Sequence, residues 1–209
     1  MIDFKSNLKE EIKKTTSYDK PFIVTFSGLP ECGKTEIARE LSKDLKIYLL
    51  SNDYVRNYFY QFTTNYSEEN RIKIEEQVKK INLYRIKKLL LTGTSFIYDK
   101  DFNTAEQFKF LQIARRIRNM DLIKIKVNSN DSDNLKRVAS RVMDYDKIYN
   151  GVIGDNVEYL SSYPEEVYYQ IKNRKPQLLP DDFFDYIVDS ENLDTKTLEK
   201  RILFNRQRK

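Results

Sequence analysis

Residues 28–35 carry the pattern with the clearest chemical meaning. They read Gly-Leu-Pro-Glu-Cys-Gly-Lys-Thr and match G-x-x-x-x-G-K-[ST] at every fixed position. An apolar run precedes them and a helical pattern follows, which is the context that a phosphate-binding loop requires. Because phosphate oxygens must meet several backbone N–H groups at once, glycine keeps the concave backbone of such a loop uncovered. The segment predicts a nucleotide-binding loop that holds phosphates with Gly28, Pro30, Glu31, Cys32, Gly33, Lys34, Thr35 and Glu36.

Side chains of this loop would supply a cation and a metal ligand. Lys34 would place its charge on the terminal phosphates as a catalytic residue, and the Thr35 hydroxyl would ligate Mg²⁺. Two residues have alternative roles. Glu31 either points outward or weakens nucleotide binding, since its carboxylate stands in a loop meant for anions. Cys32 either fills space as a small residue or takes a redox role, because a helix N-terminus lowers a thiol pKa.

Acidic residues follow the next two apolar runs of the chain. Asp53 comes after residues 46–50, and Asp99 comes after residues 95–98. Ligands of parallel α/β sheets lie beyond the carboxyl ends of the strands, so both carboxylates would meet the terminal phosphate. One would act on an acceptor hydroxyl, and the other would hold Mg²⁺. Each acid alone is equally well explained as a helix N-cap, but the pair beside a phosphate loop favours phosphoryl transfer.

Arg137 and Arg141 are further candidates for catalysis. They stand four residues apart in a predicted helix and therefore share one face. Arginines beside a transferring phosphoryl group stabilise its charge and lower the barrier. A solvated helix face explains the same spacing, so both interpretations stay open.

An alternation of strands and helices would position these residues. Apolar, β-rich runs predict strands, and apolar residues at spacings of three and four predict helices. Strands are predicted at 22–26, 46–50, 95–98, 122–127 and 183–188, and helices at 4–16, 34–44, 67–91, 104–119, 132–143, near 164–173 and at 195–206. The alternation indicates an α/β fold with right-handed crossovers. We expect a single domain over residues 1–209, with a core at about 20–143 and 183–206 and a lid or insertion at about 131–180.

The composition excludes several classes of protein. With 40% hydrophobic and 33% charged residues, the 209-residue chain has a globular rather than a disordered composition. No apolar run is long enough for a membrane span, and the first residues lack the apolar region of a signal peptide. A single Cys excludes an internal disulfide and fits a reducing cytoplasm. Because there are no histidines, any chemistry must rest on Asp, Glu, Lys, Arg, Ser, Thr or Tyr.

Four segments of the chain read GLPECGKT, LLSNDYVRNYF, FIYDKDFNTAEQFKFLQIARR and LKRVASRV. Together they resemble the P-loop kinases related to polynucleotide kinase and zeta toxin, over about residues 22–143 and the terminal strand and helix. The resemblance implies a P-loop NTPase fold, which is a three-layer α/β/α sandwich with a helical lid. It also implies a five-stranded parallel sheet in the order 2-3-1-4-5, and ATP with Mg²⁺ as cofactors.

The resemblance further implies roles for single residues. Asp53 matches the general base that acts on the acceptor hydroxyl, and Arg56 matches the arginine that binds the acceptor or its phosphate. Arg137, together with Arg141, matches lid arginines that clamp ATP. The sequence departs from the family at Glu31, where relatives carry a small residue, most often Gly. This departure raises the alternative of a degenerate kinase.

Two features bear on the acceptor. Residues 54–66 are rich in Tyr and Phe, and these rings either stack on a planar acceptor or belong to the core. Basic residues concentrate at 71–88, and a net charge of +5 suits a nucleic-acid partner as well as solvated helices. We expect an ATP- and Mg²⁺-dependent phosphotransferase whose acceptor hydroxyl belongs to a nucleoside, a polynucleotide 5′ end, a nucleotide sugar or another small molecule. The alternative is an ATP-binding regulatory or toxin-like protein with a weak or degenerate kinase site.

Overall fold

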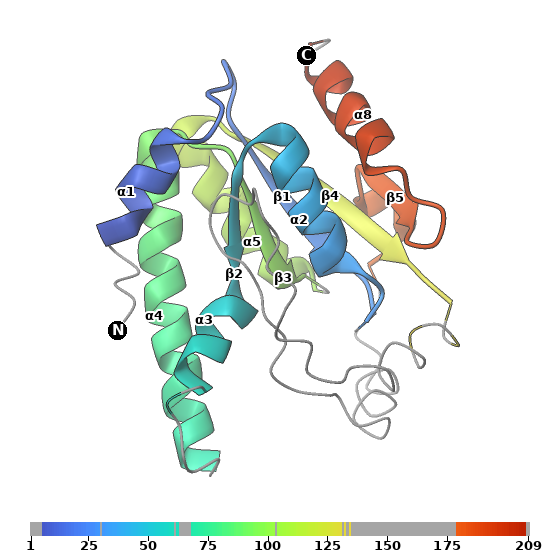
Figure 1. The fold of residues 1–209 in the computed structure, drawn as a ribbon. Helices are drawn as coiled ribbons and strands as arrows, with labels where there is room; N and C mark the ends of the chain where they lie inside the picture. The colour runs from blue at the N-terminus through green and yellow to red at the C-terminus, as the bar shows by residue number, and fades with distance from the viewer. Residues whose placement is uncertain are drawn as a thin grey trace.

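The computed structural model describes residues 6–29, 31–60, 62, 68–102, 104–130, 132, 134 and 179–207. The strands in this part of the chain are β1 (Phe22–Ser27), β2 (Tyr48–Ser51), β3 (Phe96–Asp101), β4 (Asp121–Asn128) and β5 (Tyr186–Asp189). The helices are α1 (Ser6–Lys13), α2 (Lys34–Leu45), α3 (Asn52–Tyr60), α4 (Glu68–Thr92), α5 (Ala105–Arg115) and α8 (Thr195–Gln207) (Figure 1). Short 3₁₀ turns occupy Arg116–Arg118 and Asp181–Phe183.

The five strands form one parallel sheet in the order β2-β3-β1-β4-β5, and this confirms the predicted topology. Since all strands run the same way, their carboxyl ends share one edge of the sheet. This edge lies at the bottom of Figure 1, where α2 and α3 begin. Ligands of such sheets bind at this edge, so the fold brings the segments after β1, β2 and β3 to the expected place.

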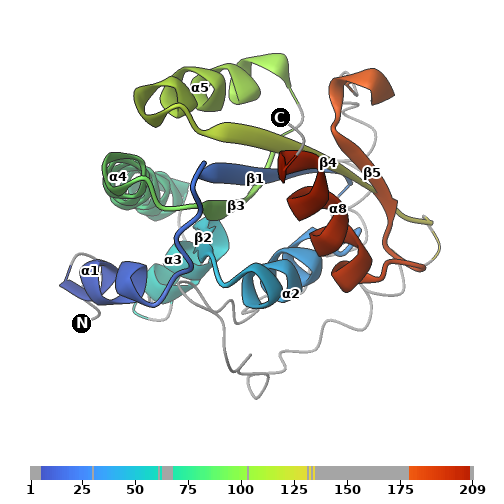
Figure 2. The ribbon, with the colours of Figure 1, turned by 90° about the horizontal axis from the view of Figure 1, so that it is seen from above.

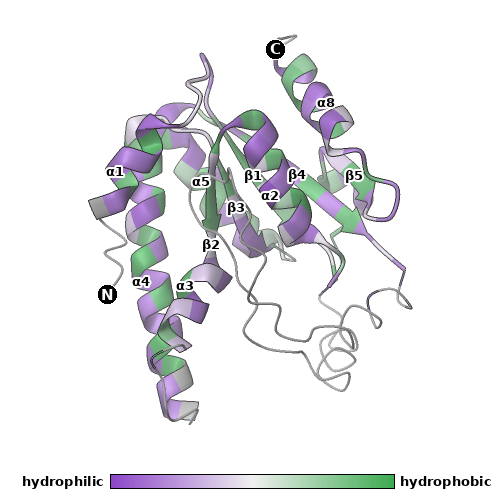
Figure 3. Ribbon diagram, viewed as in Figure 1, coloured by the Kyte–Doolittle hydropathy of each residue, from purple (hydrophilic) through white to green (hydrophobic). Residues whose placement is uncertain are grey.

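Helices cover both faces of the sheet, which confirms the three-layer α/β/α arrangement. Side chains along β1 alternate: Phe22, Val24 and Phe26 pack toward α2 and α8, whereas Ile23 belongs to the cluster formed with α4 and α5. Figure 2 shows the two layers from above, and Figure 3 shows the hydrophobic residues concentrated along the strands. Burying both faces explains why the strand sequences read as nearly continuous apolar runs.

Helix α3 is the element that the sequence pattern did not predict. It follows β2 directly and covers part of the aromatic segment 54–66. Its buried residues are Val55 and Tyr58, which pack with Ile74 and Val78 of α4. Val55, Tyr58, Phe59 and Phe62 recur at spacings of three and four, which is a helical period that the prediction overlooked among the aromatic residues.

The predicted strand at 183–188 is shorter than expected. Strand β5 begins at Tyr186, and Phe183 instead ends a 3₁₀ turn. The centroid of the Phe183 ring lies 5.0 Å from that of the Phe108 ring. The Asp185 carboxylate accepts a hydrogen bond from the Lys124 backbone N–H at 2.8 Å. The Asp185 backbone N–H also donates to the Lys124 carbonyl at 2.9 Å, and the paired residues of β4 and β5 begin one residue later.

Several predictions fall outside the residues that the structure describes. Among them are the short helix near 164–173 and nearly all of the lid at 131–180 and of the helix at 132–143. The single-domain organisation therefore stays a prediction. No helix in the described part of the chain has the length and apolar character to cross a membrane.

Candidate active site

The phosphate loop connects β1 to α2, as its sequence pattern predicted. Gly28 has φ +153°, and a Cβ at this position would lie 2.5 Å from the Val127 carbonyl oxygen and 2.8 Å from Cys32 Sγ. Gly33 has φ +90° and immediately precedes the first turn of α2, without a side chain to cap it. Glycine is therefore required at Gly28 by close backbone approach, and it leaves the start of α2 open to an anion at Gly33. Pro30, between them, lies outside the described residues.

Glu31 occupies a backbone conformation that favours glycine. Its φ is +64°, in the left-handed region, and the next residue donates its N–H to the Leu29 carbonyl at 3.3 Å to close the turn. A residue with a Cβ is less stable there than glycine by about 1 kcal/mol. Glu31 therefore lowers the stability of the loop through its backbone conformation, and it also adds a carboxylate to the loop.

Cys32 is a buried filler of the loop. Its side chain is fully buried in the cluster formed with α2 and α8, and it accepts a hydrogen bond from Lys34 Nζ at 3.5 Å. Burial raises the pKa of the thiol, and the nearby Lys34 charge opposes this without cancelling it. The expectation that the helix N-terminus lowers this pKa is therefore wrong, and the space-filling interpretation is the one that fits.

Lys34 folds back over the loop. Its Nζ donates to the Leu29 carbonyl at 2.6 Å and to the Gly28 carbonyl at 3.2 Å, and it lies 3.0 Å from Asp101 Oδ1. Burial by itself would lower the pKa of Lys34, but the Asp101 carboxylate and Cys32 raise it overall. Lys34 is thus a firmly charged group beside the loop. Asp99 and Asp101 share a face of the strand because they are two residues apart, so no sequence pattern indicates which of them pairs with Lys34.

Asp99 of β3 contacts the first turn of α2 and the end of β2. It is buried, and it accepts hydrogen bonds from Thr35 Oγ1 at 3.3 Å and from Ser51 Oγ at 3.5 Å. Asp99 lies inside β3 rather than after it, where the pairing of β3 with β1 shifts register between Thr25 and Phe26. Such an irregularity redirects side chains next to a site. Ser51 is an additional residue of the site that sequence patterns did not single out.

The surroundings of Asp99 disfavour the ionised form of its carboxyl group. Burial is the largest cause that raises the pKa of its carboxyl from 3.8 to about 7, and the charges of Asp53 and Asp101 act in the same direction. The hydrogen bond from Thr35 and the charge of Lys34 oppose this rise. A divalent cation beside Asp99 would favour the ionised carboxylate.

The donor set around Asp99 fits Mg²⁺. The Thr35 hydroxyl and the Asp99 carboxylate are the oxygen ligands that this ion prefers, and Mg²⁺ usually adds water and substrate phosphates to one or two protein ligands. Within the described residues no group of three or more His, Cys, Asp or Glu side chains could hold a metal ion.

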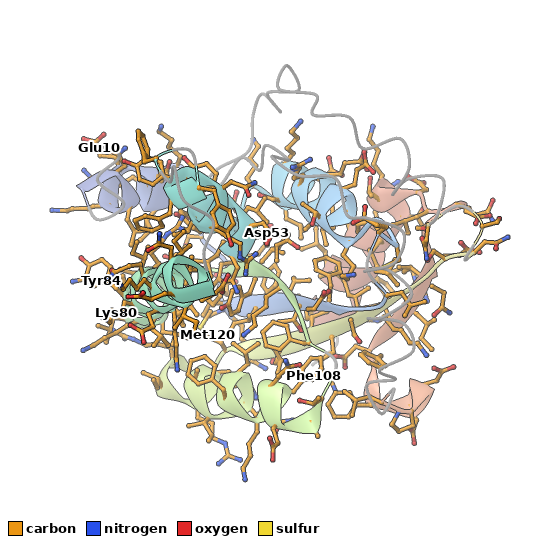
Figure 4. The ribbon with its side chains drawn as sticks, turned by 90° about the horizontal axis from the view of Figure 1, so that it is seen from below. Glu10, Asp53, Lys80, Tyr84, Phe108 and Met120 are labelled. Atoms are coloured by element: carbon orange, nitrogen blue, oxygen red, sulfur yellow. The ribbon has the colours of Figure 1, made fainter. Side chains whose placement is uncertain are left out.

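Asp53 and Arg56 lie one turn apart at the start of α3, on the same edge of the sheet. Figure 4, seen from below, labels Asp53 near the middle of this edge. Arg56 Nη1 contacts Asp53 Oδ1, while Arg56 Nε and Nη2 lie 2.5 Å and 3.2 Å from the two carboxylate oxygens of Glu75 in α4. Burial would lower the pKa of Arg56, but the hydrogen bonds and charges of Glu75 and Asp53 raise it overall. Sequence patterns did not indicate Glu75, because its partner Arg56 lies in α3, which was not predicted as a helix.

The aromatic segment 54–66 forms core where the structure describes it. Tyr58 is buried and packs edge to face against Phe59 and Phe62, with ring centroids 5.7 Å and 5.1 Å away. The core interpretation therefore holds for Tyr58, whereas Phe62 is 69% exposed.

A buried polar network supports the start of α3. Asn52 Oδ1 accepts hydrogen bonds from Asn82 Nδ2 at 2.7 Å and from the Tyr98 hydroxyl at 3.2 Å. Arg85 donates to Asn82 Oδ1 at 3.3 Å and to the Tyr48 hydroxyl, and its guanidinium lies over the Tyr48 ring. Arg85 is thus a buried structural residue and does not belong to a solvated basic surface at 71–88.

The predicted lid arginines, Arg137 and Arg141, lie outside the described residues. Their proposed contact with ATP stays a prediction, and the described part of the site consists of the phosphate loop and the ends of β2 and β3 with α3.

Comparison with known proteins shows which solved structures share this fold. No protein-family model matches the sequence, and no curated protein sequence matches it. A candidate kinase from Chloroflexus aurantiacus superposes with a TM-score of 0.68 at 17% identity, over 91% of this chain and 98% of that one. Shikimate kinase from Bacteroides thetaiotaomicron gives a TM-score of 0.52 at 10% identity, over 89% of this chain and 98% of that one. The chain has the fold of P-loop kinases.

A toxin–antitoxin structure is also similar. The PezAT system of Streptococcus pneumoniae matches with a TM-score of 0.54 at 16% identity, over 66% of this chain and 58% of that one. At such identities each likeness shows the fold alone, so activity must be argued from the site.

Proposed function

We propose that the chain is an ATP- and Mg²⁺-dependent phosphotransferase that moves the γ-phosphoryl group of ATP to a hydroxyl. The observation that carries the proposal is the contact between Thr35 of the phosphate loop and the buried Asp99 of β3. It joins a phosphate-binding backbone to a metal-binding carboxylate. Asp53 lies close enough to raise the pKa of Asp99, so a possible base stands at the same place.

The reaction needs few groups from the protein. The acceptor oxygen attacks the γ-phosphorus, the bond from that phosphorus to the bridging β–γ oxygen breaks, and ADP leaves. Asp53 takes the proton of the attacking hydroxyl. Lys34 and the open N-terminus of α2 stabilise the negative charge on the phosphates. Lys34 must exchange its contact with Asp101 for a phosphate oxygen.

Thr35 and Asp99 would hold the Mg²⁺ ion. When bound, the ion neutralises phosphate charge and fixes the orientation of the β- and γ-oxygens. Ser51 keeps Asp99 in place through its hydroxyl.

The finer assignments rest on the sequence resemblance. We propose membership of the polynucleotide kinase and zeta toxin-like group, a lid at about 131–180 and closure of that lid by Arg137 and Arg141 over ATP. A reducing cytoplasm is the compartment we propose, because the single cysteine is buried and free.

A second candidate function is an ATP-binding switch without efficient transfer. Glu31 favours it, because its left-handed backbone conformation is unfavourable for a residue with a Cβ and because it adds a carboxylate to the loop. In this alternative ATP binds and controls contacts with another protein.

A transfer screen with γ-labelled ATP tests the proposal. Nucleosides, 5′-hydroxyl oligonucleotides, nucleotide sugars and sugar acids serve as acceptors, and ATP affinity is measured in parallel by calorimetry. We expect Lys34→Ala to abolish ATP binding, whereas Lys109→Ala on the exposed face of α5 leaves it unchanged. Unchanged affinity in Lys34→Ala would overturn the loop assignment. Bound ATP without transfer to any acceptor would favour the switch.

A further inference from the structure

Asn52, the first residue of α3, is held by side chains that are buried behind the candidate site. Its Oδ1 accepts hydrogen bonds from Asn82 Nδ2 of α4 at 2.7 Å and from the Tyr98 hydroxyl of β3 at 3.2 Å. Asn82 and Tyr98 are only 2% and 6% exposed. The next residue of the chain is Asp53, whose side chain is 47% exposed. The proposed base is thus a partly exposed group whose neighbour in the chain is anchored in the core.

The buried side chain of Arg85 sets the direction of these hydrogen bonds. A guanidinium has donors only, so Asn82 must turn its oxygen toward Arg85, which donates to it at 3.3 Å. The Nδ2 group of Asn82 is therefore left to face Asn52, which accepts with its own oxygen. The Tyr98 hydroxyl donates to this same oxygen. The donor-only character of Arg85 thereby fixes how the amide of Asn82 meets that of Asn52.

The network also joins the start of α3 to β2. Arg85 donates to the Tyr48 hydroxyl, and its guanidinium lies 5.3 Å from the centroid of the Tyr48 ring. Strand β2 runs from Tyr48 to Ser51, the residue before Asn52. Apolar side chains could fill the same space without the cost of burying polar groups, but they would not select one orientation of the amides. The hydrogen bonds therefore give the start of α3 a defined direction.

Tyr98 reaches the site from behind. Its neighbour Asp99 accepts a hydrogen bond from Thr35 of the phosphate loop, and neighbouring residues of a strand point to opposite sides. Tyr98 accordingly packs in the cluster formed with α4 and α5. Its hydroxyl acts on the site through Asn52, so Tyr98 is a positioning residue rather than a catalytic one.

We propose that Tyr98, Asn82 and Arg85 position Asp53 for proton transfer by fixing Asn52. The inference rests on the proposed function and adds positioning residues to it. Proton transfer needs the acceptor hydroxyl within hydrogen-bond distance of its base, and a displacement of about 1 Å costs on the order of 100-fold in rate. Without the Tyr98 hydroxyl, Asn52 loses one of its two donors. Transfer should then slow about tenfold or more, while ATP binding at the phosphate loop stays unchanged.

The variant Tyr98→Phe removes this hydroxyl and keeps the ring. Tyr186→Phe is the matched control, because Tyr186 is also buried in a strand and its hydroxyl also contacts an asparagine, Asn205, at 3.0 Å. ADP release from ATP and Mg²⁺ is measured with water as the acceptor and with every acceptor found in the transfer screen. We expect kcat to fall in Tyr98→Phe while KM for ATP is unchanged, and neither to change in Tyr186→Phe. Wild-type kcat in Tyr98→Phe, or an equal loss in both variants, would overturn the positioning role.

A double-mutant cycle shows whether Tyr98 acts through Asp53. If it does, Tyr98→Phe has no further effect on kcat once Asp53→Asn is present. The same fold loss in both backgrounds would indicate a general structural effect and refute the proposal. Asn82→Ala removes the other donor to Asn52 and should give the same pattern in a second cycle.

Amide hydrogen exchange supplies a readout that needs no acceptor. In the full-length Tyr98→Phe variant, exchange followed by mass spectrometry should become faster at the start of α3 and stay unchanged at the start of α2. Unaltered exchange at α3 would contradict the proposal. The two proposals fail in different ways: full transfer in Asp53→Asn contradicts the proposed base, whereas a loss in Asp53→Asn without one in Tyr98→Phe contradicts the positioning role alone.

Discussion

Asp99 makes the stability of the ligand-free protein depend on pH in a direction opposite to that of most acids. Burial, with the charges of Asp53 and Asp101, raises the pKa of its carboxyl from 3.8 to about 7. The folded protein therefore keeps a proton on Asp99 at pH values where the unfolded chain has lost it. Stability falls as the pH rises from about 4 to about 7, and the full cost is present above that range.

The magnitude follows from the two pKa values of Asp99. One pKa unit corresponds to about 1.36 kcal/mol, so the complete cost above pH 7 is at most about 4 kcal/mol. Between pH 5 and pH 8 the linkage relation gives a loss of about 3 kcal/mol. Asp99→Asn keeps an oxygen that accepts from Thr35 and Ser51 but cannot ionise. We expect the stability of this variant relative to wild type to increase by about 3 kcal/mol from pH 5 to pH 8.

Urea unfolding followed by circular dichroism measures this difference. The titrations are made between pH 5 and pH 8 in the presence of EDTA, so that no divalent cation occupies the site. Asp182→Asn, an exposed acid in the turn before β5, is the matched control and should follow wild type. If Asp99→Asn also follows wild type across this range, the buried, proton-holding state of Asp99 is refuted.

Three further substitutions probe the loop and the base. Gly28→Ala places a methyl group 2.5 Å from the Val127 carbonyl oxygen, so the loop must shift. ATP affinity by calorimetry should fall about tenfold or more. Wild-type affinity in this variant would contradict the role of the phosphate loop in ATP binding. Glu31→Gly removes left-handed strain and should stabilise the protein by about 0.5 kcal/mol or more in urea unfolding; a less stable variant would show that Glu31 makes compensating contacts. Asp53→Asn should keep ATP affinity while transfer, measured as ADP release with acceptor, falls about 100-fold or more; full activity would remove Asp53 from the base role.

Local patterns in the sequence predicted much of the fold and part of the site. The buried strands are short apolar runs, and the predicted start of the helix at 104–119 agrees with α5, which begins with a capping box of Thr104 and Gln107. The glycines of the phosphate loop were predicted because a backbone that must wrap a phosphate excludes side chains. These features depend on neighbours in the chain, so a single sequence contains them.

Contacts between distant segments were harder to predict. The partnership of Arg56 with Glu75 depends on how α3 packs against α4, and no pattern within either segment specifies this packing. Arg85 reads as one more basic residue of a charged helix until the fold buries it against Tyr48.

The sequence by itself determined the phosphate loop, the alternation of strands and helices and the identity of the acids at the strand ends. Only the tertiary structure decided which acid contacts which residue of the phosphate loop. Asp99 lies against Thr35 and Asp101 against Lys34, at the end of β3 where the pairing with β1 shifts register. The physical reason is that a motif constrains the backbone of a few consecutive residues, whereas charge pairing and burial depend on distances that the packing of the whole sheet sets.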